Sequence, residues 1–283
     1  MAWLRSGVLE TFLKYLLTFS LMARLDCETV ESIYSSLENI LGIDRNGLDL
    51  RLDAFENSDE TAPDDESWNF IVDFVTNRNR GRIFHDSTCW FHATRTHNPA
   101  GFKQGIFPTD QMLNPVWEFL YSLVANQLSK NQWLKFRRQV EVDYYGLGKM
   151  TFHAKRKYEQ GPYGFLIRDD AFYRGDCGHD YMRTPEVVEE ISRCFKHQFR
   201  FDLQQVFHES TEPCVVKFAS PRPRLCELGC ALHYLLDVRT GTRRNSFSHC
   251  CYPGTGQAIP SASILDIVWP AILHTGRRFS RHH

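Results

Sequence analysis

The chain has 283 residues, of which 42% are hydrophobic and 24% are charged, and its formal net charge at pH 7 is -1. This balance is ordinary for a globular protein and argues against a bulk polycationic nucleic-acid binder, while it leaves room for a local basic groove. The nine cysteines favour free thiols in a reducing compartment over a secreted disulfide scaffold, so we expect a cytoplasmic protein.

Residues 1–80 predict a helical accessory region. Apolar residues between Val8 and Met22 follow helical spacing, but Glu10 and Lys14 interrupt them, which is not typical of a signal peptide or a membrane span. Further helices are expected from Glu28 to Leu41 and from Trp68 to Asn77, with an acidic, proline-broken linker before the second. We expect no association with a membrane.

Residues 81–283 predict a second region, because short β-prone runs alternate there with helices in an α+β arrangement. The expected helices are Pro115 to Gln127, with Pro115 in the first turn, then Asn131 to Val140 and Pro185 to Phe195. The expected strands are Thr88 to Ala93, Gly164 to Ile167, Cys214 to Phe218, Phe247 to Tyr252 and Ile264 to Trp269.

The strongest motif lies at the end of the first expected strand, which reads Cys89-Trp90-Phe91-His92-Ala93-Thr94-Arg95. A buried strand there delivers a histidine and a hydroxyl at its exposed end, and the small Ala93 permits a ligand to approach the backbone. A short helical turn follows and ends at Gly105. From spacing alone, the simpler interpretation is that His92 is a core histidine and that Gly105 caps the turn.

The segment resembles the first motif of ADP-ribosyltransferases, the superfamily of diphtheria-toxin-like toxins and poly-ADP-ribose polymerases. In that family a strand reads aromatic-His-Gly followed by Thr or Ser, and an apolar-Gly-apolar turn comes about ten residues later. Phe91-His92-Ala93-Thr94 and Gly105-Ile106 match this pattern, with Ala93 in place of the usual glycine. The chain looks like a divergent, bacterial-type member.

The resemblance implies a fold and a set of contacts with NAD, which would be the substrate. The fold would be a split-sheet, ADP-ribosyltransferase-like core over residues 81–283. His92 would bond the adenine-side ribose, and the backbone of Ala93 would hold the nicotinamide amide. Thr94 would help to anchor the dinucleotide, and Arg95 would hold its pyrophosphate through a bidentate contact.

The family has two later motifs. The chain offers a candidate for the first and departs from the second. Tyr163, in the run Gly161-Pro162-Tyr163-Gly164-Phe165-Leu166-Ile167, is the candidate to stack on nicotinamide, and packing at a strand edge is its alternative role. The usual catalytic glutamate is missing, since no glutamate follows Cys230, and Ser248 or His249 occupies the expected position. His249 would then be the general base.

The resemblance therefore implies an NAD-dependent mono-ADP-ribosyltransferase acting on a macromolecular acceptor, either protein or RNA/DNA. A toxin or defence-effector role follows only by analogy with the family. The missing glutamate argues against chain elongation and also permits an inactive NAD fold. An RNA 2'-phosphotransferase would share the fold, but too few of that family's arginines stand in matching places.

Other segments suggest two alternatives to the transferase, a nucleic-acid-binding module and a zinc site. The alternative function is a nucleic-acid-binding module on a degenerate, non-catalytic NAD fold, suggested by basic-aromatic runs at Lys135–Arg138 and His153–Tyr158. A zinc site is disfavoured, because Cys226 and Cys230 have the spacing of one helix face and His249 is followed by two adjacent cysteines. We therefore expect no metal.

Overall fold

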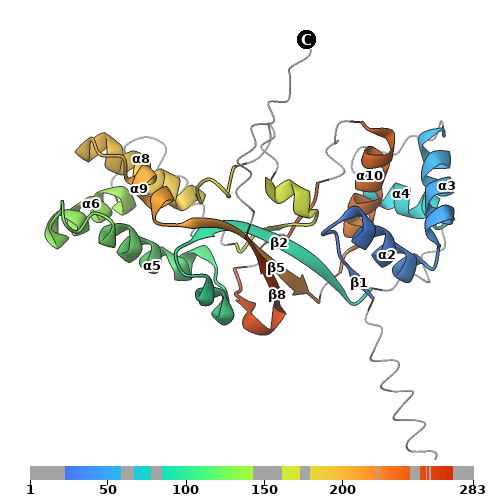
Figure 1. The fold of residues 1–283 in the computed structure, drawn as a ribbon, viewed down its shortest axis with the longest axis horizontal. Coiled ribbons are helices and arrows are strands. Elements are labelled where there is room, and N and C mark those ends of the chain that lie inside the picture. The colour runs from blue at the N-terminus through green and yellow to red at the C-terminus, as the bar shows by residue number, and fades with distance from the viewer. Residues whose placement is uncertain are drawn as a thin grey trace, which may run out of the picture. The chain divides into compact units, whose positions relative to one another are not determined.

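The computed structural model describes residues 23–58, 67–77, 85–142, 161–172, 179–221, 223–242, 249–252, 254 and 256–269. The helix expected between Val8 and Met22 lies outside these residues. Helices and strands are mixed, which confirms an α+β protein (Figure 1). The elements are β1 Arg24–Leu25, α2 Val30–Leu41, α3 Arg45–Glu56, α4 Ser67–Val75, β2 Ser87–Thr96, η2 Pro99–Gln104, β3 Gly105–Ile106, α5 Thr109–Ser122, α6 Lys130–Val142, β4 Gly164–Phe165, η3 Arg168–Phe172, α8 Glu186–Phe199, α9 Leu203–Glu209, β5 Glu212–Ser220, α10 Leu225–Thr240, β6 Cys251–Tyr252, β7 Ile259–Pro260, η5 Ser261–Ser263 and β8 Ile264–Val268.

The strands and helices with the clearest periodicity lie where the sequence predicted them. Strands β2, β5 and β8 cover the runs expected around residues 88–93, 214–218 and 264–269. Helix α2 begins at a capping box, in which Thr29 accepts a hydrogen bond from the Ser32 amide, and it ends at Gly42 with φ +66°. The short turn η2 ends at Gly105, as expected.

Helices α3, α5 and α9 differ from the prediction, and no helix was expected at α9. Helix α5 begins at Thr109 and contains Pro115 in its interior, so the expected start at Pro115 was wrong. Pro115 is exposed, so the carbonyl that loses its helical partner can be solvated by water. Helix α3 was not predicted, because only Leu48 and Leu52 mark its buried face.

The sheet is mixed, and β2 lies inside it. The strand order is β6-β4-β2-β5-β8, and β1 pairs with β2 in parallel. Strands β5 and β8 are antiparallel, with Val215 opposite Val268 and a register shift between Lys217 and Phe218. Strands β3 and β7 form a separate antiparallel pair. Because β4 neighbours β2, the segment that enters β4 lies beside the motif strand.

The chain divides into two compact units, and the boundary differs from the one expected at residue 80. Unit 1 comprises residues 1–90, 165–170 and 219–251, and unit 2 comprises residues 91–164, 171–218 and 252–283. Helix α10 joins the N-terminal helices because it packs on α4, where a β-carbon on Gly229 would lie 2.3 Å from the Trp68 carbonyl oxygen. Local sequence gives no indication of this distant pairing.

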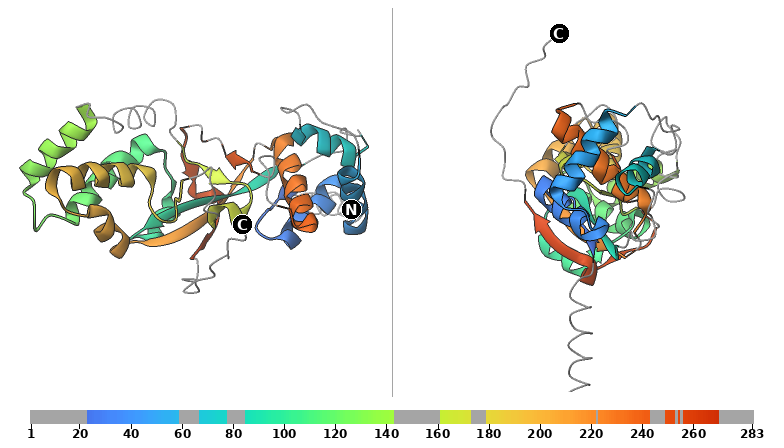
Figure 2. Two further views of the ribbon diagram at one scale, coloured as in Figure 1. Left: turned by 90° about the horizontal axis from the view of Figure 1, so that it is seen from above. Right: turned by 90° about the vertical axis from the view of Figure 1, so that its right-hand side faces the viewer.

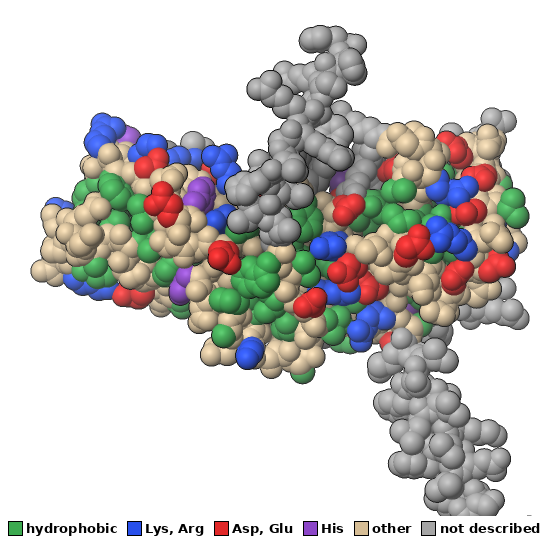
Figure 3. All heavy atoms as spheres, viewed as in Figure 1, with side chains coloured by type: hydrophobic (Ala, Val, Ile, Leu, Met, Phe, Trp, Pro, Cys, Tyr) green, Lys and Arg blue, Asp and Glu red, His purple; other side chains and the backbone are tan. Residues whose placement is uncertain are grey.

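Unit 1 has a core between α10 and helices α2, α3 and α4, which surround it in both ribbon views (Figures 1 and 2). The Phe55 ring packs edge-on against Phe74 and His233. Outside this core, charges of opposite sign stand side by side over α2 and α3 (Figure 3). Arg239 there forms salt bridges with Asp49 and Asp53, each at 2.6 Å.

Unit 2 has an aromatic core among α5, α6, α8 and α9. Trp117, Trp133, Phe136 and Phe195 are buried. Trp133 and Phe136 contact each other and both of the other rings at ring-centroid distances of 5.3–5.8 Å. Burial of such rings is the main source of stability in a helical cluster of this kind. Among the helices of the described residues, none combines the length and apolarity needed to span a membrane.

Candidate functional site

His92 lies in the interior of β2, which continues to Thr96, so the expected strand end at Ala93 was wrong. It contacts the segment that enters β4. Its Nδ1 is 2.7 Å from the carbonyl oxygen of Tyr163. Because a carbonyl oxygen only accepts, Nδ1 carries the proton and Nε2 keeps its lone pair in the neutral ring. Burial lowers the pKa of His92, and the Tyr163 hydrogen bond opposes that shift only in part. At neutral pH the ring is therefore uncharged, with Nε2 as an acceptor.

Backbone contacts from residues 254 and 256 fix the segment that carries Tyr163. The amide of Gly256 donates to the Gly161 carbonyl at 3.0 Å, and a β-carbon on Gly254 would lie 2.7 Å from the Pro162 carbonyl oxygen. Gly161 itself has φ +62°, and a β-carbon there would lie 3.5 Å from the Tyr163 ring. The glycines before β4 thus allow two backbone segments to lie in contact. Tyr163 beside them is 37% exposed.

The other residues of the β2 motif have different environments. Ala93 is buried with 5% exposure, and Thr94 is half-buried. Arg95 makes four hydrogen bonds: Nε to Thr211 Oγ1 at 3.0 Å, Nη1 to the Met182 carbonyl at 3.0 Å, and Nη2 to the carbonyls of His208 and Thr211 at 3.0 and 2.6 Å. Arg95 thus fastens β2 to the start of β5, and its contact with a pyrophosphate stays a prediction.

His249 belongs to unit 1 and is paired with a buried acid. Its Nδ1 is 3.1 Å from Asp170 Oδ2, and the Asp170 side chain is 3% exposed against 38% for His249. A carboxylate oxygen accepts, so Nδ1 carries the proton and Nε2 is the basic nitrogen. Ser248, the other residue expected at this position, lies outside the described residues.

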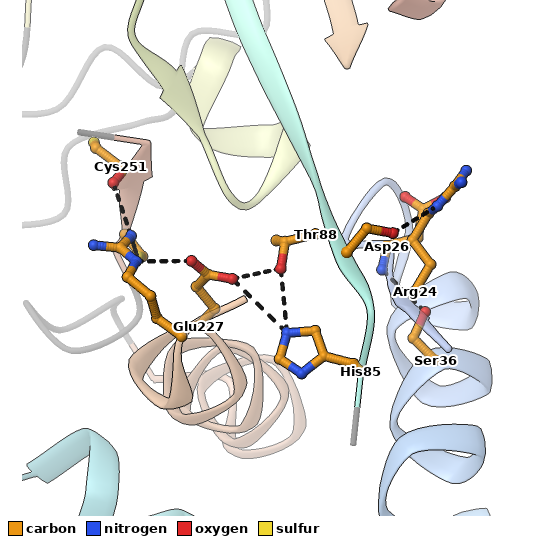
Figure 4. A network of polar contacts seen from close by, with 10 residues as sticks. Arg24, Asp26, Ser36, His85, Thr88, Glu227 and Cys251 are labelled. Carbon is orange, nitrogen blue, oxygen red and sulfur yellow. Dashed lines mark hydrogen bonds and ion pairs between the residues drawn. The ribbon is translucent and has the colours of Figure 1, made fainter. Parts of the chain in front are cut away.

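Two buried acids of unit 1, Asp170 and Glu227, were not predicted as site residues from the sequence. Asp170 stands 79 positions from His249, so no local spacing connects the two. Glu227 accepts a hydrogen bond from Thr88 and lies 3.8 Å from His85 Nε2 and 2.8 Å from Arg224 Nε (Figure 4). These partners lower the pKa of Glu227 against the opposing effect of burial, which is the largest single influence.

The two predicted groups of site residues therefore fall in two units. His92 and Tyr163 are brought together in unit 2, with Ala93 and Thr94 alongside on the same strand. His249 is paired with Asp170 in unit 1. Among the described residues, no group of three or more His, Cys, Asp or Glu side chains is placed to hold a metal ion.

No protein-family model, curated protein or solved structure matches the chain.

Proposed function

We propose that the chain is an NAD-dependent mono-ADP-ribosyltransferase whose dinucleotide site is built on His92 and Tyr163. The observation that carries the proposal is the hydrogen bond between His92 Nδ1 and the Tyr163 carbonyl. It joins two residues that stand 71 positions apart and that the family resemblance selects separately for the same ligand.

The tautomer of His92 suits a ribose contact. With Nδ1–H committed to Tyr163, Nε2 can accept a hydrogen bond from a ribose hydroxyl. The Tyr163 ring is partly exposed, so one face of it can receive a flat heterocycle such as nicotinamide. Ala93 adds little side-chain volume on the strand between His92 and Thr94, which favours close approach of the nicotinamide amide to its backbone.

The chemistry also needs a base for the acceptor. Cleavage of the bond between nicotinamide and ribose builds positive charge on the ribose, as in glycoside hydrolysis, and the acceptor must lose a proton as it attacks. We assign this role to His249 from its chemistry, because Asp170 fixes the tautomer in which Nε2 can take a proton.

The acceptor class is a macromolecule, protein or nucleic acid, and the transfer is single. The absence of a glutamate after Cys230 supports single transfer, since chain elongation in the family relies on that residue. The alternative is a nucleic-acid-binding module with a non-catalytic NAD fold. It would have the same contact between His92 and Tyr163 but would not cleave NAD.

The test compares two variants of His92 with the wild-type chain. His92→Asn can keep a donor near the position of Nδ1 but lacks Nε2, whereas His92→Gln can place an acceptor near Nε2 but loses the short contact to Tyr163. NAD binding is measured by calorimetry and turnover by nicotinamide release with protein and RNA/DNA acceptors. We expect His92→Asn to lose at least tenfold in NAD affinity, or about 1.4 kcal/mol, with an unchanged circular-dichroism spectrum.

The possible results distinguish the transferase from the non-catalytic module. If the wild-type chain does not bind NAD, the dinucleotide site is wrong. NAD binding without nicotinamide release, together with salt-dependent binding of RNA or DNA, favours the non-catalytic module. Release that survives His249→Asn unchanged removes His249 from the mechanism and leaves the NAD site in place.

A further inference from the structure

Two helices of unit 2, α6 and α8, carry cations in runs that contain no acid. No acidic residue occurs between Lys130 and Arg138, and none occurs between Arg193 and Arg200. The acids of α8 all precede Arg193. We define the basic face as the exposed Lys and Arg side chains of these runs that form no salt bridge with a described residue: Lys135, Arg138, Arg193 and Arg200.

Side-chain contacts bring the two runs together in unit 2. The Phe136 ring packs on Phe195 at a centroid distance of 5.3 Å and on Phe199 at 5.6 Å. Between the same segments, Gln198 Nε2 donates a hydrogen bond to Gln139 Oε1 at 3.1 Å. The middle of α6 therefore lies against the last two turns of α8, and both helices belong to unit 2. Lys and Arg side chains gather on the surface over α8 (Figure 3).

Neighbouring cations on the same helices are neutralised by acids, whereas those of the basic face are not. Lys130, Arg137 and Lys196 each form a salt bridge with an acid at 2.6–2.9 Å. The helix dipole accounts for cations only in the last turn of a helix, and Lys135 and Arg193 lie before the last turns of α6 and α8. The charges of the basic face are therefore available to an anionic partner.

Arg200 stands where glycine is the usual residue. It caps the C-terminus of α8 with φ +57°, and α2 and α10 end in the same left-handed conformation at Gly42 and Gly241. A side chain at such a cap strains the backbone, whereas glycine does not. The arginine thus adds a charge to the basic face at a position where glycine would make a less strained cap.

The side chains around the basic face distinguish among anionic partners. Insertion into an anionic membrane and burial in the core of a protein interface both use exposed apolar or aromatic side chains. Among the described residues of α6 and α8, Leu134 is the one large hydrophobic side chain that is exposed, at 37%. Phosphates are bound instead by Lys and Arg together with side-chain amides, and Gln139 and Gln198 supply amides between the two runs. The surface therefore fits a sugar–phosphate backbone best.

We propose that the basic face binds the sugar–phosphate backbone of RNA or DNA, which makes a nucleic acid the macromolecular acceptor. The inference rests on the proposed transferase function for the transfer itself, whereas the binding needs no NAD. Contacts of cations with phosphates carry no sequence information. Binding is therefore independent of sequence, and it weakens as salt rises because bound phosphates release fewer counterions at high salt.

The experiment uses the full chain without NAD and follows the fluorescence anisotropy of a labelled single-stranded RNA and of DNA with the same sequence. Dissociation constants are measured between roughly 0.05 and 0.2 M salt. Four phosphate contacts predict that log Kd rises with log salt with a slope of about 3 for a single strand. Arg138→Gln should lower that slope by about 0.7, which corresponds to binding about fivefold weaker at about 0.1 M salt.

Two further variants separate binding from folding. Arg200→Gly removes a charge together with the left-handed strain, so it should weaken binding about fivefold while the melting temperature stays the same or rises. Lys103→Gln is the matched control, because Lys103 on η2 is exposed, forms no salt bridge with a described residue and loses the same charge. This control should bind RNA and DNA like the wild-type chain. The circular-dichroism spectrum of each variant checks that it is folded.

The inference is overturned if the wild-type chain binds neither RNA nor DNA, or if Lys103→Gln weakens binding as much as Arg138→Gln does. Binding of polyglutamate or of phosphatidylserine vesicles at least as tight as that of the nucleic acids overturns the choice of partner. If only the transferase proposal fails, the chain binds RNA or DNA through the basic face but releases no nicotinamide from NAD. Nicotinamide release with a protein acceptor alone keeps the transferase and overturns nucleic acid as its acceptor.

Discussion

Gly254 lies so close to Gly161 that a β-carbon on Gly254 would stand 2.6 Å from the Gly161 α-carbon. Gly254 also has φ +48°, a conformation that side chains other than hydrogen strain. The two glycines therefore set the backbone position of the segment whose last carbonyl accepts the hydrogen bond from His92.

Gly254→Ala should displace this segment and weaken the proposed NAD site. Overpacking of this kind costs about 1–3 kcal/mol, so we expect NAD affinity to fall by roughly tenfold, measured by calorimetry. Gly101→Ala is the control, because its nearest neighbour would lie 3.9 Å away. Equal affinities for the two variants would show that the Gly254–Gly161 contact does not position the site.

Acid should destabilise unit 2 partly through His92. Burial lowers the pKa of His92 in the folded chain, so the unfolded chain binds more protons below the ordinary imidazole pKa of about 6.5. The stabilising effect is complete above that pH and is lost as pH falls toward the lowered value. Hydrogen exchange of β2 at pH 7.5 and pH 5 should show the loss, and His92→Asn should lessen it. His208, whose pKa is also lowered by burial, acts in the same direction. An undiminished loss in His92→Asn would contradict the prediction.

Gly229→Ala should destabilise unit 1. The new methyl would lie 2.3 Å from the Trp68 carbonyl oxygen and 2.7 Å from its α-carbon, so α10 and α4 must separate. We expect a loss of about 1–3 kcal/mol in the free energy of unfolding, measured by urea denaturation. Val238→Ala, on the exposed side of the same helix at 45% exposure, should change it by less than ~0.5 kcal/mol. A Gly229→Ala chain as stable as the wild type would contradict this prediction.

Glu227→Gln should weaken unit 1 at neutral pH and reduce its sensitivity to acid. The substitution removes a buried charge that accepts from Thr88 and from Arg224, which should cost about 2 kcal/mol. Because the folded pKa of Glu227 is lowered, its contribution is present above the unfolded pKa of about 4.3 and is lost as pH falls through the folded value. Unfolding between pH 7 and pH 3 measures both effects. The prediction fails if wild type and variant lose stability in parallel across that range.

Arg95→Lys should affect stability more than NAD binding. Lysine cannot reproduce the forked contacts to Thr211, Met182 and His208, so the melting temperature should fall by several degrees. NAD affinity at a temperature where the variant is folded should change less than in His92→Asn. A larger loss of affinity than in His92→Asn would support the pyrophosphate role for Arg95.

Local patterns were read correctly where neighbours along the chain decide the structure. The strand β2 follows from a short run of apolar, β-prone residues, and the turn ending at Gly105 follows from the conformational freedom of glycine. Helix α5 was placed six residues too late, because a surface proline can lie inside a helix when water solvates the released carbonyl. Helix α3 was missed because its two buried leucines form too weak a pattern.

The sequence by itself determined that His92 lies on a strand, that Tyr163 directly precedes another, and that no glutamate follows Cys230. Tertiary structure alone decided that His92 bonds the Tyr163 carbonyl and that Asp170 holds His249. It also decided that α10 packs with the N-terminal helices. The reason is that periodicity records contacts a few residues apart, whereas these pairs form only after the chain path has brought distant segments together.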